Sequence, residues 1–124
     1  MLNDGPVIVI VDDDASIRQA LDDLIGSSGL RAATFASAEE FLRSERAATA
    51  ACLILDLRMP GMGGRELHER LRRDGVRIPV IFLTAHGDEA ARLWASRTGV
   101  TAFLGKPFDP DALLTAVESA LRKV

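Results

Sequence analysis

The strongest constraint on the fold of this chain is a regular alternation of short apolar runs with segments of helical character, repeated five times along 124 residues. The apolar runs, rich in Val, Ile and Leu, predict strands at 6–11, 30–35, 51–56, 78–83 and 100–104. Near-continuous apolar runs of this length are typical of parallel strands that are covered on both faces. The run at 30–35 is more mixed, which favours an edge position.

The segments between these runs carry signals for the ends of helices. Asp14 can cap a first helix, and Ser37-Ala38-Glu39-Glu40 has the spacing of a capping box at the start of a second. Further helices are predicted at about 63–73, with Gly75 as a left-handed C-cap, at about 88–97, and after Asp109-Pro110. Five β-then-α units with right-handed crossovers predict one doubly wound α/β domain, a parallel sheet in the order 2-1-3-4-5.

The composition fits such a domain and argues against several function classes. Hydrophobic residues make up 48% of the chain and charged residues 27%, which is ordinary for a globular protein. A formal net charge of −3 gives no general attraction to nucleic acid or to anionic membranes. The arginines between Arg65 and Arg77 alternate with acidic residues, which favours a solvated helix face over a docking patch.

The cysteine content and the hydropathy bear on the compartment. The one cysteine, Cys52, lies inside an apolar run, so we expect a buried, inert thiol and a reducing environment. The sequence shows no charged-then-apolar leader and no apolar run long enough to span a bilayer. We therefore expect a cytoplasmic protein.

Charged side chains stand at the ends of three of the predicted strands. Asp12 and Asp13 follow the first run directly, Asp56 ends the third, and Lys106 follows the fifth. Because the carboxyl ends of parallel strands meet at one edge of a sheet, we expect these groups to converge on one site. Hard carboxylate oxygens suit Mg²⁺, and three clustered carboxylates without a cation would repel one another. The pattern therefore predicts a metal cradle that includes a nucleophile.

Phosphoryl transfer is the chemistry that suits these groups. The Asp56 carboxylate can attack phosphorus and form an acyl phosphate, and the Lys106 ammonium can pair with a phosphoryl oxygen. Thr84 follows the fourth run, and its hydroxyl could hydrogen-bond the same group. Taken singly, each aspartate could merely cap a helix or begin a turn, and the threonine could do the same. Their combination at one edge of the sheet favours the functional interpretation.

Four segments together resemble the receiver domain of two-component response regulators, in the order and at the spacing of that family. They are Val11-Asp12-Asp13-Asp14, Leu55 to Gly64, Phe82 to Gly87, and Phe103 to Phe108. Ser37 to Leu42 and Arg58 to Met62 are similar to the receivers of FixJ-type regulators. The resemblance covers essentially the whole chain. It implies one receiver domain over residues 1–124 with a flavodoxin-like (βα)5 fold.

The resemblance also implies a metal site. The ion would be Mg²⁺, with Mn²⁺ as a substitute. Asp13 and Asp56 would bind it through their carboxylates, Asp12 through water, and Arg58 through its backbone carbonyl.

The same resemblance implies the phosphorylation site and the switch. Asp56 would be the phosphoacceptor, and Lys106 and Thr84 would contact the phosphoryl oxygens. Phe103 would occupy the aromatic switch position beside Thr84, and Lys106-Pro107 would be a cis peptide.

The implied function is that of a signalling phosphoacceptor. The chain would take a phosphoryl group from a histidine kinase or a histidine phosphotransfer protein. The surface of its fourth helix, fifth strand and fifth helix would then change to control a partner or its own dimerisation. It would phosphorylate and slowly dephosphorylate itself, so it would not be an enzyme with a separate substrate. No direct contact with nucleic acid or membrane is expected.

Three other functions compete with this one. A phosphohydrolase would need a second aspartate two residues after Asp56, where Arg58 stands. A flavin or nucleotide binder would need a Gly- or Ser/Thr-rich loop after the first run, where three acids stand. An interaction module of the same fold that does not depend on phosphorylation is the main alternative.

Several residues carry two interpretations. Arg58 could shield the phosphoryl group or be solvated, and His86 could gate water or be a plain loop residue. Trp94 could mark a partner surface or be partly buried. The chain ends at Val124, just after the fifth predicted helix, so it could act alone or be part of a longer protein with an output domain.

Overall fold

The computed structural model describes residues 6–85, 89–98 and 102–122. The strands are β1 (Val7–Val11), β2 (Arg31–Phe35), β3 (Ala50–Asp56), β4 (Val80–Ala85) and β5 (Ala102–Lys106). The helices are α1 (Ala15–Ser27), α2 (Ala38–Arg43), α3 (Gly64–Arg73), α4 (Glu89–Thr98) and α5 (Pro110–Arg122), with a short 3₁₀ helix, η1 (Arg46–Ala48). Among these described helices, none combines the length and the apolar character needed to cross a membrane.

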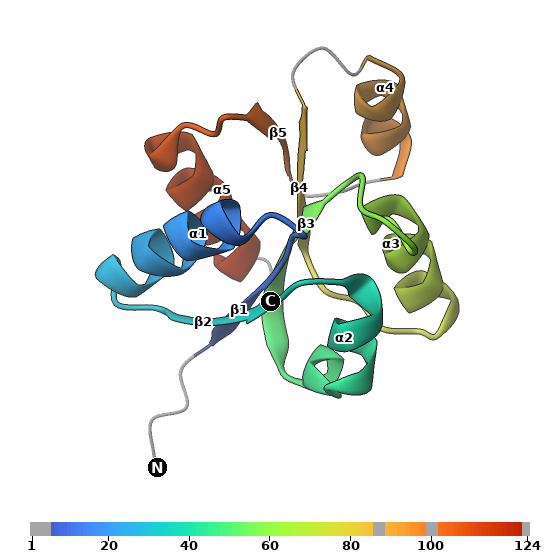
Figure 1. Ribbon diagram of the computed structural model, residues 1–124, viewed down its shortest axis with the longest axis horizontal. Coiled ribbons are helices and arrows are strands. Elements are labelled where there is room, and N and C mark those ends of the chain that lie inside the picture. Colours follow the sequence, from blue (N-terminus) through green and yellow to red (C-terminus); the bar gives the residue numbers. More distant parts are fainter. Residues whose placement is uncertain (1–5, 86–88, 99–101, 123–124) are drawn as a thin grey trace.

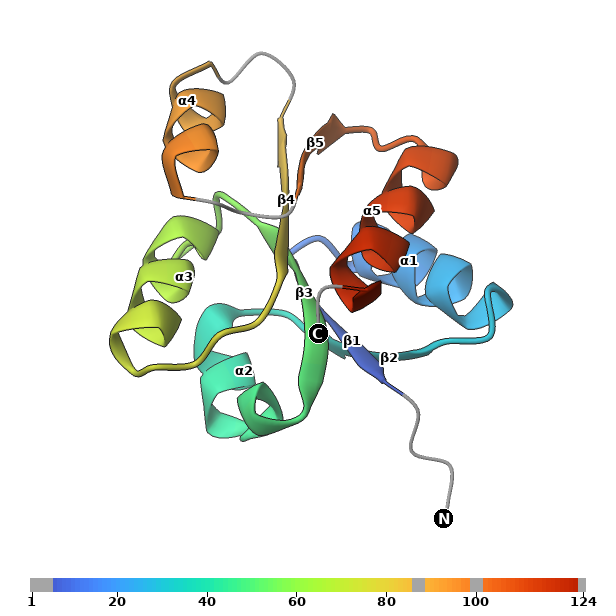
Figure 2. The ribbon, with the colours of Figure 1, turned by 180° about the vertical axis from the view of Figure 1, so that it is seen from behind.

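All strands of the described sheet pair in parallel, in the order β2-β1-β3-β4-β5. This confirms the predicted topology and the edge position of the more mixed strand, β2. Helices α1 and α5 cover one face of the sheet, and α2, α3 and α4 cover the other (Figures 1 and 2). Every sheet face is therefore covered by helices, which explains why the strands carry so few polar residues.

The side chains of β1 show how one strand serves both faces. Val9 and Val11 pack in the cluster under α2 and α3, whereas Ile8 and Ile10 pack in the cluster under α1 and α5. All four are fully buried. Successive residues of a strand point to opposite faces, so a strand between two helical layers needs apolar residues at every position.

Side-chain caps fix where two helices begin, as the sequence predicted. Asp14 Oδ1 accepts hydrogen bonds from the Ser16 backbone N–H at 2.9 Å and from its hydroxyl at 2.7 Å. Ser37 Oγ accepts from the Glu40 N–H at 3.1 Å, and Glu40 Oε1 accepts from the Ala36 N–H at 3.0 Å. A cap of this kind contributes about 1 kcal/mol. Gly75, with φ +77°, ends the turn after α3, which confirms the predicted left-handed C-cap.

The predicted start of β4 is wrong by two residues. The strand begins at Val80 rather than at residue 78. Pro79 has no N–H to donate, and its carbonyl accepts from the Leu53 N–H at 2.9 Å at the edge of the ladder. The start of α3 also moves by one residue, because Gly63 is its N-cap and Gly64 its first residue.

The ends of β4 and β5 lie two residues later than predicted. Thr84 pairs with Gly105, and Ala85 pairs with Lys106, so the parallel ladder continues through all four residues. Thr84 and Lys106 are therefore part of the strands and do not follow them. The predicted starts of the fifth strand at residue 100 and of the fourth helix at Asp88 lie outside the described residues.

Cys52 has the environment that the sequence predicted. It lies in the middle of β3 and is fully buried. Burial raises the pKa of its thiol to about 12, so the reactive thiolate is not formed at neutral pH.

Trp94 joins α4 to the layer formed by α3 and the sheet. Its ring centroid lies 5.1 Å from that of Phe82 and 6.0 Å from that of His68, both in edge-to-face geometry. The Arg65 guanidinium lies 4.9 Å from the centre of the Trp94 ring. Each such contact contributes about 0.5–1.5 kcal/mol. The partly buried packing role of Trp94 is thus confirmed, whereas its neighbour Leu93 is 54% exposed.

Gly64 makes the closest approach between α3 and the end of β3. A Cβ at this position would overlap the backbone carbonyl oxygen of Asp56. We expect Gly64→Ala to lower the free energy of unfolding by about 1–3 kcal/mol, because backbone would have to move. As a control, a Cβ at Gly26 in α1 would meet no atom of the described residues within 4 Å, so Gly26→Ala should stabilise by up to about 1 kcal/mol. Urea denaturation of both variants measures the difference, and equal effects would contradict this account.

Candidate functional site

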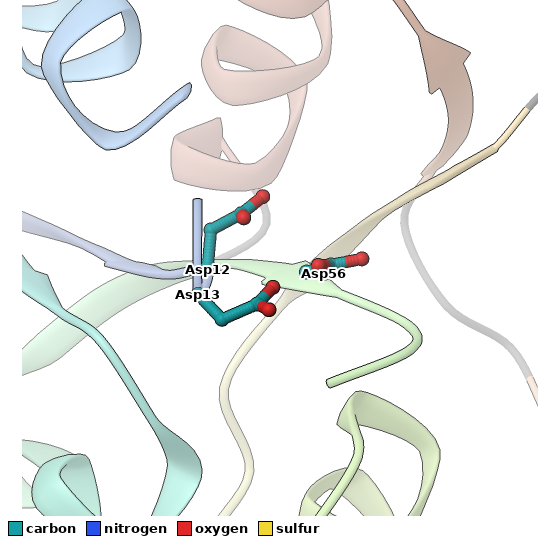
Figure 3. Close-up of side chains that lie close together, drawn as sticks. All are labelled: Asp12, Asp13 and Asp56. Carbon is teal, nitrogen blue, oxygen red and sulfur yellow. The ribbon is translucent and has the colours of Figure 1, made fainter. Parts of the chain in front are cut away.

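The carboxyl ends of β1, β3 and β5 bring the predicted acidic residues and the lysine together, and Figure 3 shows the three aspartates. Asp12 directly follows β1, and Asp56 and Lys106 are the last residues of β3 and β5. Lys106 Nζ lies 3.0 Å from Asp12 Oδ2 and 3.3 Å from Asp56 Oδ2. Asp12 is 1% exposed and Asp56 is 6% exposed, so the ion pairs are largely shielded from solvent. One ammonium therefore bridges two buried carboxylates.

A third carboxylate completes the cluster on the solvent side. One oxygen each from Asp12, Asp13 and Asp56 can be chosen so that all lie within 4.8 Å of one another. Asp13 is exposed, and Figure 3 shows its side chain beside the other two. Three hard oxygen donors this close fit a divalent cation such as Mg²⁺, because the cation would offset their mutual repulsion.

Backbone contacts orient the two buried carboxylates. Asp12 Oδ1 accepts from the Asp14 N–H at 2.9 Å, and the Arg18 guanidinium donates to the Asp12 carbonyl at 2.8 Å. Asp56 Oδ1 accepts from the Arg58 N–H at 3.3 Å. For each carboxylate, the turn after the strand holds one oxygen, and the other oxygen faces Lys106. Asp14, by contrast, acts as the helix cap. Arg18 was not singled out from the sequence, because nothing in its spacing distinguishes it from other helix arginines.

The burial and the clustering change the protonation of these groups. Burial and the nearby Asp12 charge raise the pKa of Asp56 to about 6, although Lys106 opposes this shift. Burial would lower the pKa of Lys106, but its hydrogen bond to Asp12 and the charges of both aspartates raise it. Lys106 therefore stays charged at neutral pH. With a pKa of about 6, the Asp56 carboxyl is mostly ionised at neutral pH, but less completely than an ordinary aspartate.

Thr84 brings a hydroxyl to the same end of the sheet. Asp56 pairs with Leu83 in the ladder, so Thr84 lies one residue further along β4. Thr84 is 3% exposed, and within the described part of the chain its Oγ1 has no hydrogen-bond partner. A buried hydroxyl without a partner is unusual in folded proteins. It is available to a group bound at this edge.

The remaining predicted residues lie around the site. The Arg58 side chain is exposed, and the Lys106–Pro107 peptide is cis, as the resemblance implied. Phe103 is half-buried, and the Arg92 guanidinium from α4 lies 5.3 Å from the centre of its ring. His86 lies outside the described residues.

Fold and site together define a receiver domain, and comparison with known proteins agrees. The chain belongs to the response regulator receiver domain family, whose sequence model matches residues 8–118. Response regulator protein TmoT of Ectopseudomonas mendocina is 42% identical over 116 residues, which cover 94% of this chain and 53% of that protein. Transcriptional regulatory protein FixJ of Bradyrhizobium diazoefficiens is 36% identical over 116 residues, which cover 94% of this chain and 57% of that protein.

Solved structures show the same relationship. The crystal structure of FixJ-N matches with a TM-score of 0.86 at 32% identity, covering 100% of this chain and 98% of that one. The response regulator StyR matches with a TM-score of 0.87 at 44% identity, covering 94% of this chain and 59% of that one. The likeness to FixJ-type receivers is therefore confirmed. The chain spans about half the length of the curated relatives it matches.

The raised pKa of Asp56 predicts a pH dependence in Mg²⁺-free solution. The carboxyl should titrate near pH 6 in the folded protein, compared with 3.8 in an unperturbed aspartate. The stabilisation that comes from the protonated Asp56 carboxyl is fully present below the pKa of the unfolded state. It is lost as the pH rises through the folded-state pKa of about 6. At neutral pH the loss amounts to at most about 3 kcal/mol. Carbon-13 NMR of the carboxyl and urea denaturation between pH 4 and pH 7.5 measure both effects.

Asp56→Asn provides the control for this titration. The variant should lose this component of the pH dependence. Its free energy of unfolding, minus that of the wild type, should therefore rise across the same pH range. Mg²⁺ should move the Asp56 titration of the wild type downward. A titration near pH 4 without metal would contradict the account.

Proposed function

We propose that this receiver domain accepts a phosphoryl group on Asp56 from the phosphohistidine of a histidine kinase or phosphotransfer protein, with Mg²⁺ as cofactor. The observation that carries the proposal is the buried Asp56 carboxylate, 3.3 Å from Lys106 Nζ and clustered with Asp12 and Asp13. Membership of the receiver family supports it, as do relatives that are described as response regulators.

In the transfer step, one Asp56 oxygen attacks phosphorus while the bond from phosphorus to the histidine nitrogen breaks. The carboxylate must be ionised for this attack, yet burial favours its neutral form. A divalent ion held by Asp12, Asp13, Asp56 and the Arg58 carbonyl would favour the ionised form and offset charge on the phosphoryl oxygens. Hydrolysis of the acyl phosphate would then reset the domain. No separate substrate is turned over.

Lys106 and Thr84 are placed to bind the new phosphoryl group. The Lys106 ammonium already lies against Asp56 and could exchange this contact for a charge-assisted bond to a phosphoryl oxygen. Within the described residues, the Thr84 hydroxyl has no hydrogen bond to give up if it turns toward the same group. Both contacts would form only after phosphorylation, so both favour the phosphorylated state.

The path from Thr84 to the surface runs through β5. Phe82 pairs with Phe103 and Thr84 with Gly105, so Phe103 lies near Thr84 on the same face of the sheet. Among the described residues, no atom lies within 4 Å of a Cβ built at Gly105, so none of them fills the space next to Thr84 there. If Thr84 moves toward the phosphoryl group, Phe103 could turn inward and leave its contact with Arg92 on α4. The surface formed by α4, β5 and α5 would change as a result.

The energies indicate a partial switch in the isolated domain. Moving a population from 1:99 to 99:1 requires about 5.5 kcal/mol of differential stabilisation. A charge-assisted hydrogen bond contributes about 1.5–3 kcal/mol, and losing the exposed cation–π contact between Phe103 and Arg92 would cost about 0.5–1 kcal/mol. A partner, or a second copy of the domain bound at the changed surface, would supply the remainder.

Intact mass after incubation with acetyl phosphate tests the chemistry. The wild type should gain one phosphoryl group when Mg²⁺ is present, and Asp56→Asn should gain none. Asp14→Asn is a matched control, because asparagine keeps the helix cap and should not prevent the gain. If neither acetyl phosphate nor a phosphohistidine donor modifies the wild type, the domain works as a phosphorylation-independent interaction module.

Thr84→Ala separates phosphorylation from the switch. The variant keeps Asp56 and Lys106, so it should still gain a phosphoryl group. It should lose most of any phosphorylation-dependent change in elution on size exclusion, because the contact that draws position 84 toward the site is missing. Wild-type and variant elution compared with and without phosphorylation provide the measurement. A full change in the variant would exclude Thr84 from the switch.

A further inference from the structure

The loop that follows Asp56, residues 57–63, is held to the strand end by backbone contacts. The Leu57 N–H donates to the Leu83 carbonyl at 2.9 Å, and the Gly64 N–H donates to the Leu57 carbonyl at 2.9 Å. These contacts fix the start of the loop and its junction with α3. The loop also contains Arg58, whose N–H contacts the Asp56 carboxylate. Its conformation therefore bears directly on the site.

A side chain from a different helix holds the far part of this loop. Glu39 lies in α2, and its Oε2 accepts a hydrogen bond from the Met62 N–H at 3.1 Å, 23 positions along the chain. Gly61 has φ +75°, and a Cβ there would lie 2.9 Å from the same Glu39 oxygen. The carboxylate thus rests directly on the backbone of Gly61 and Met62. At position 61, only glycine fits without strain.

Glu39 is not needed for the start of its own helix. The capping contacts at the start of α2 are made by Ser37 and by Glu40, the next residue. Hydrogen bonds from its own backbone N–H and from the Met62 N–H lower the pKa of Glu39, so the bond to Met62 is charge-assisted at neutral pH. The neighbouring glutamates therefore have different tasks.

We propose that Glu39 is a positioning residue for the phosphorylation site: it holds Met62 and thereby fixes loop 57–63, including the Arg58 carbonyl expected to bind the metal ion. The inference rests on the proposed function, since the Arg58 carbonyl matters to the reaction only if a metal ion binds beside Asp56. Groups that orient a metal ligand contribute to affinity without touching the metal themselves. Glu39 would do this from α2, an element that supplies no ligand.

Calorimetric Mg²⁺ titration of the unphosphorylated protein tests this role. Glu39→Ala should bind Mg²⁺ about tenfold more weakly, the low end for residues that orient a ligand. Glu39→Gln, whose amide oxygen can accept the same N–H, should recover most of the affinity. Glu40→Ala is the matched control: it should lower Tm through loss of the cap and leave the affinity unchanged. Wild-type affinity in Glu39→Ala, or an equal loss in Glu40→Ala, would overturn the proposal.

Amide hydrogen exchange at Met62, followed by NMR without Mg²⁺, reads the contact independently of any phosphorylation. Exchange at Met62 should be at least about tenfold faster in Glu39→Ala than in the wild type or Glu40→Ala. If the wild type neither binds Mg²⁺ nor gains a phosphoryl group, the proposed function fails, while faster Met62 exchange would still show that Glu39 holds the loop. Unchanged exchange in Glu39→Ala would overturn the positioning role itself.

Gly61→Ala provides a test that leaves Glu39 in place. The added Cβ should displace the Glu39 carboxylate and weaken Mg²⁺ binding by itself. In the Glu39→Ala background the carboxylate is already gone, so the same change should cause a smaller further loss, which comes only from the backbone strain at φ +75°. Fully additive losses would contradict the proposal.

Discussion

The structure depends on one ammonium group shared between two buried carboxylates. Lys106 lies 3.0 Å from Asp12 and 3.3 Å from Asp56, and so connects the ends of β1, β3 and β5. Taking such charges out of water is costly unless they are paired, so the three strand ends must keep this arrangement. Burial, together with the excess of negative charge that this arrangement leaves, raises the pKa of Asp56, and the same excess fits a divalent cation.

The sequence was informative where a residue's position follows from the strand pattern alone. Asp12, Asp13, Asp56 and Lys106 stand at the ends of apolar runs, and parallel strands place such ends at one edge. The strand order could be predicted for a similar reason, because right-handed crossovers allow few arrangements of five such units. The covered strands could be recognised since residues on both faces are buried, as Ile8 and Val9 are.

Features that depend on contacts between distant segments could not be predicted. Glu39 and Glu40 stand side by side in a capping pattern, and nothing in that pattern tells which one reaches Met62. His68 lies in the Arg-rich segment that was expected to form a solvated helix face, yet it is 8% exposed. The ends of β4 and β5 were misplaced because strand length is set by the register of the partner strand, which local composition does not contain. The roles of the site residues stay predictions.

Trp94 dominates the intrinsic fluorescence of the protein, because the chain has few other fluorescent groups. The chain contains one tryptophan and no tyrosine, so its near-ultraviolet emission comes almost entirely from one indole. That indole of α4 contacts the His68 imidazole and the Arg65 guanidinium, both of α3. Any shift of α4 relative to α3 would change its surroundings. The protein thus carries a built-in optical probe of the helix that its signal is expected to move, and it needs no attached dye.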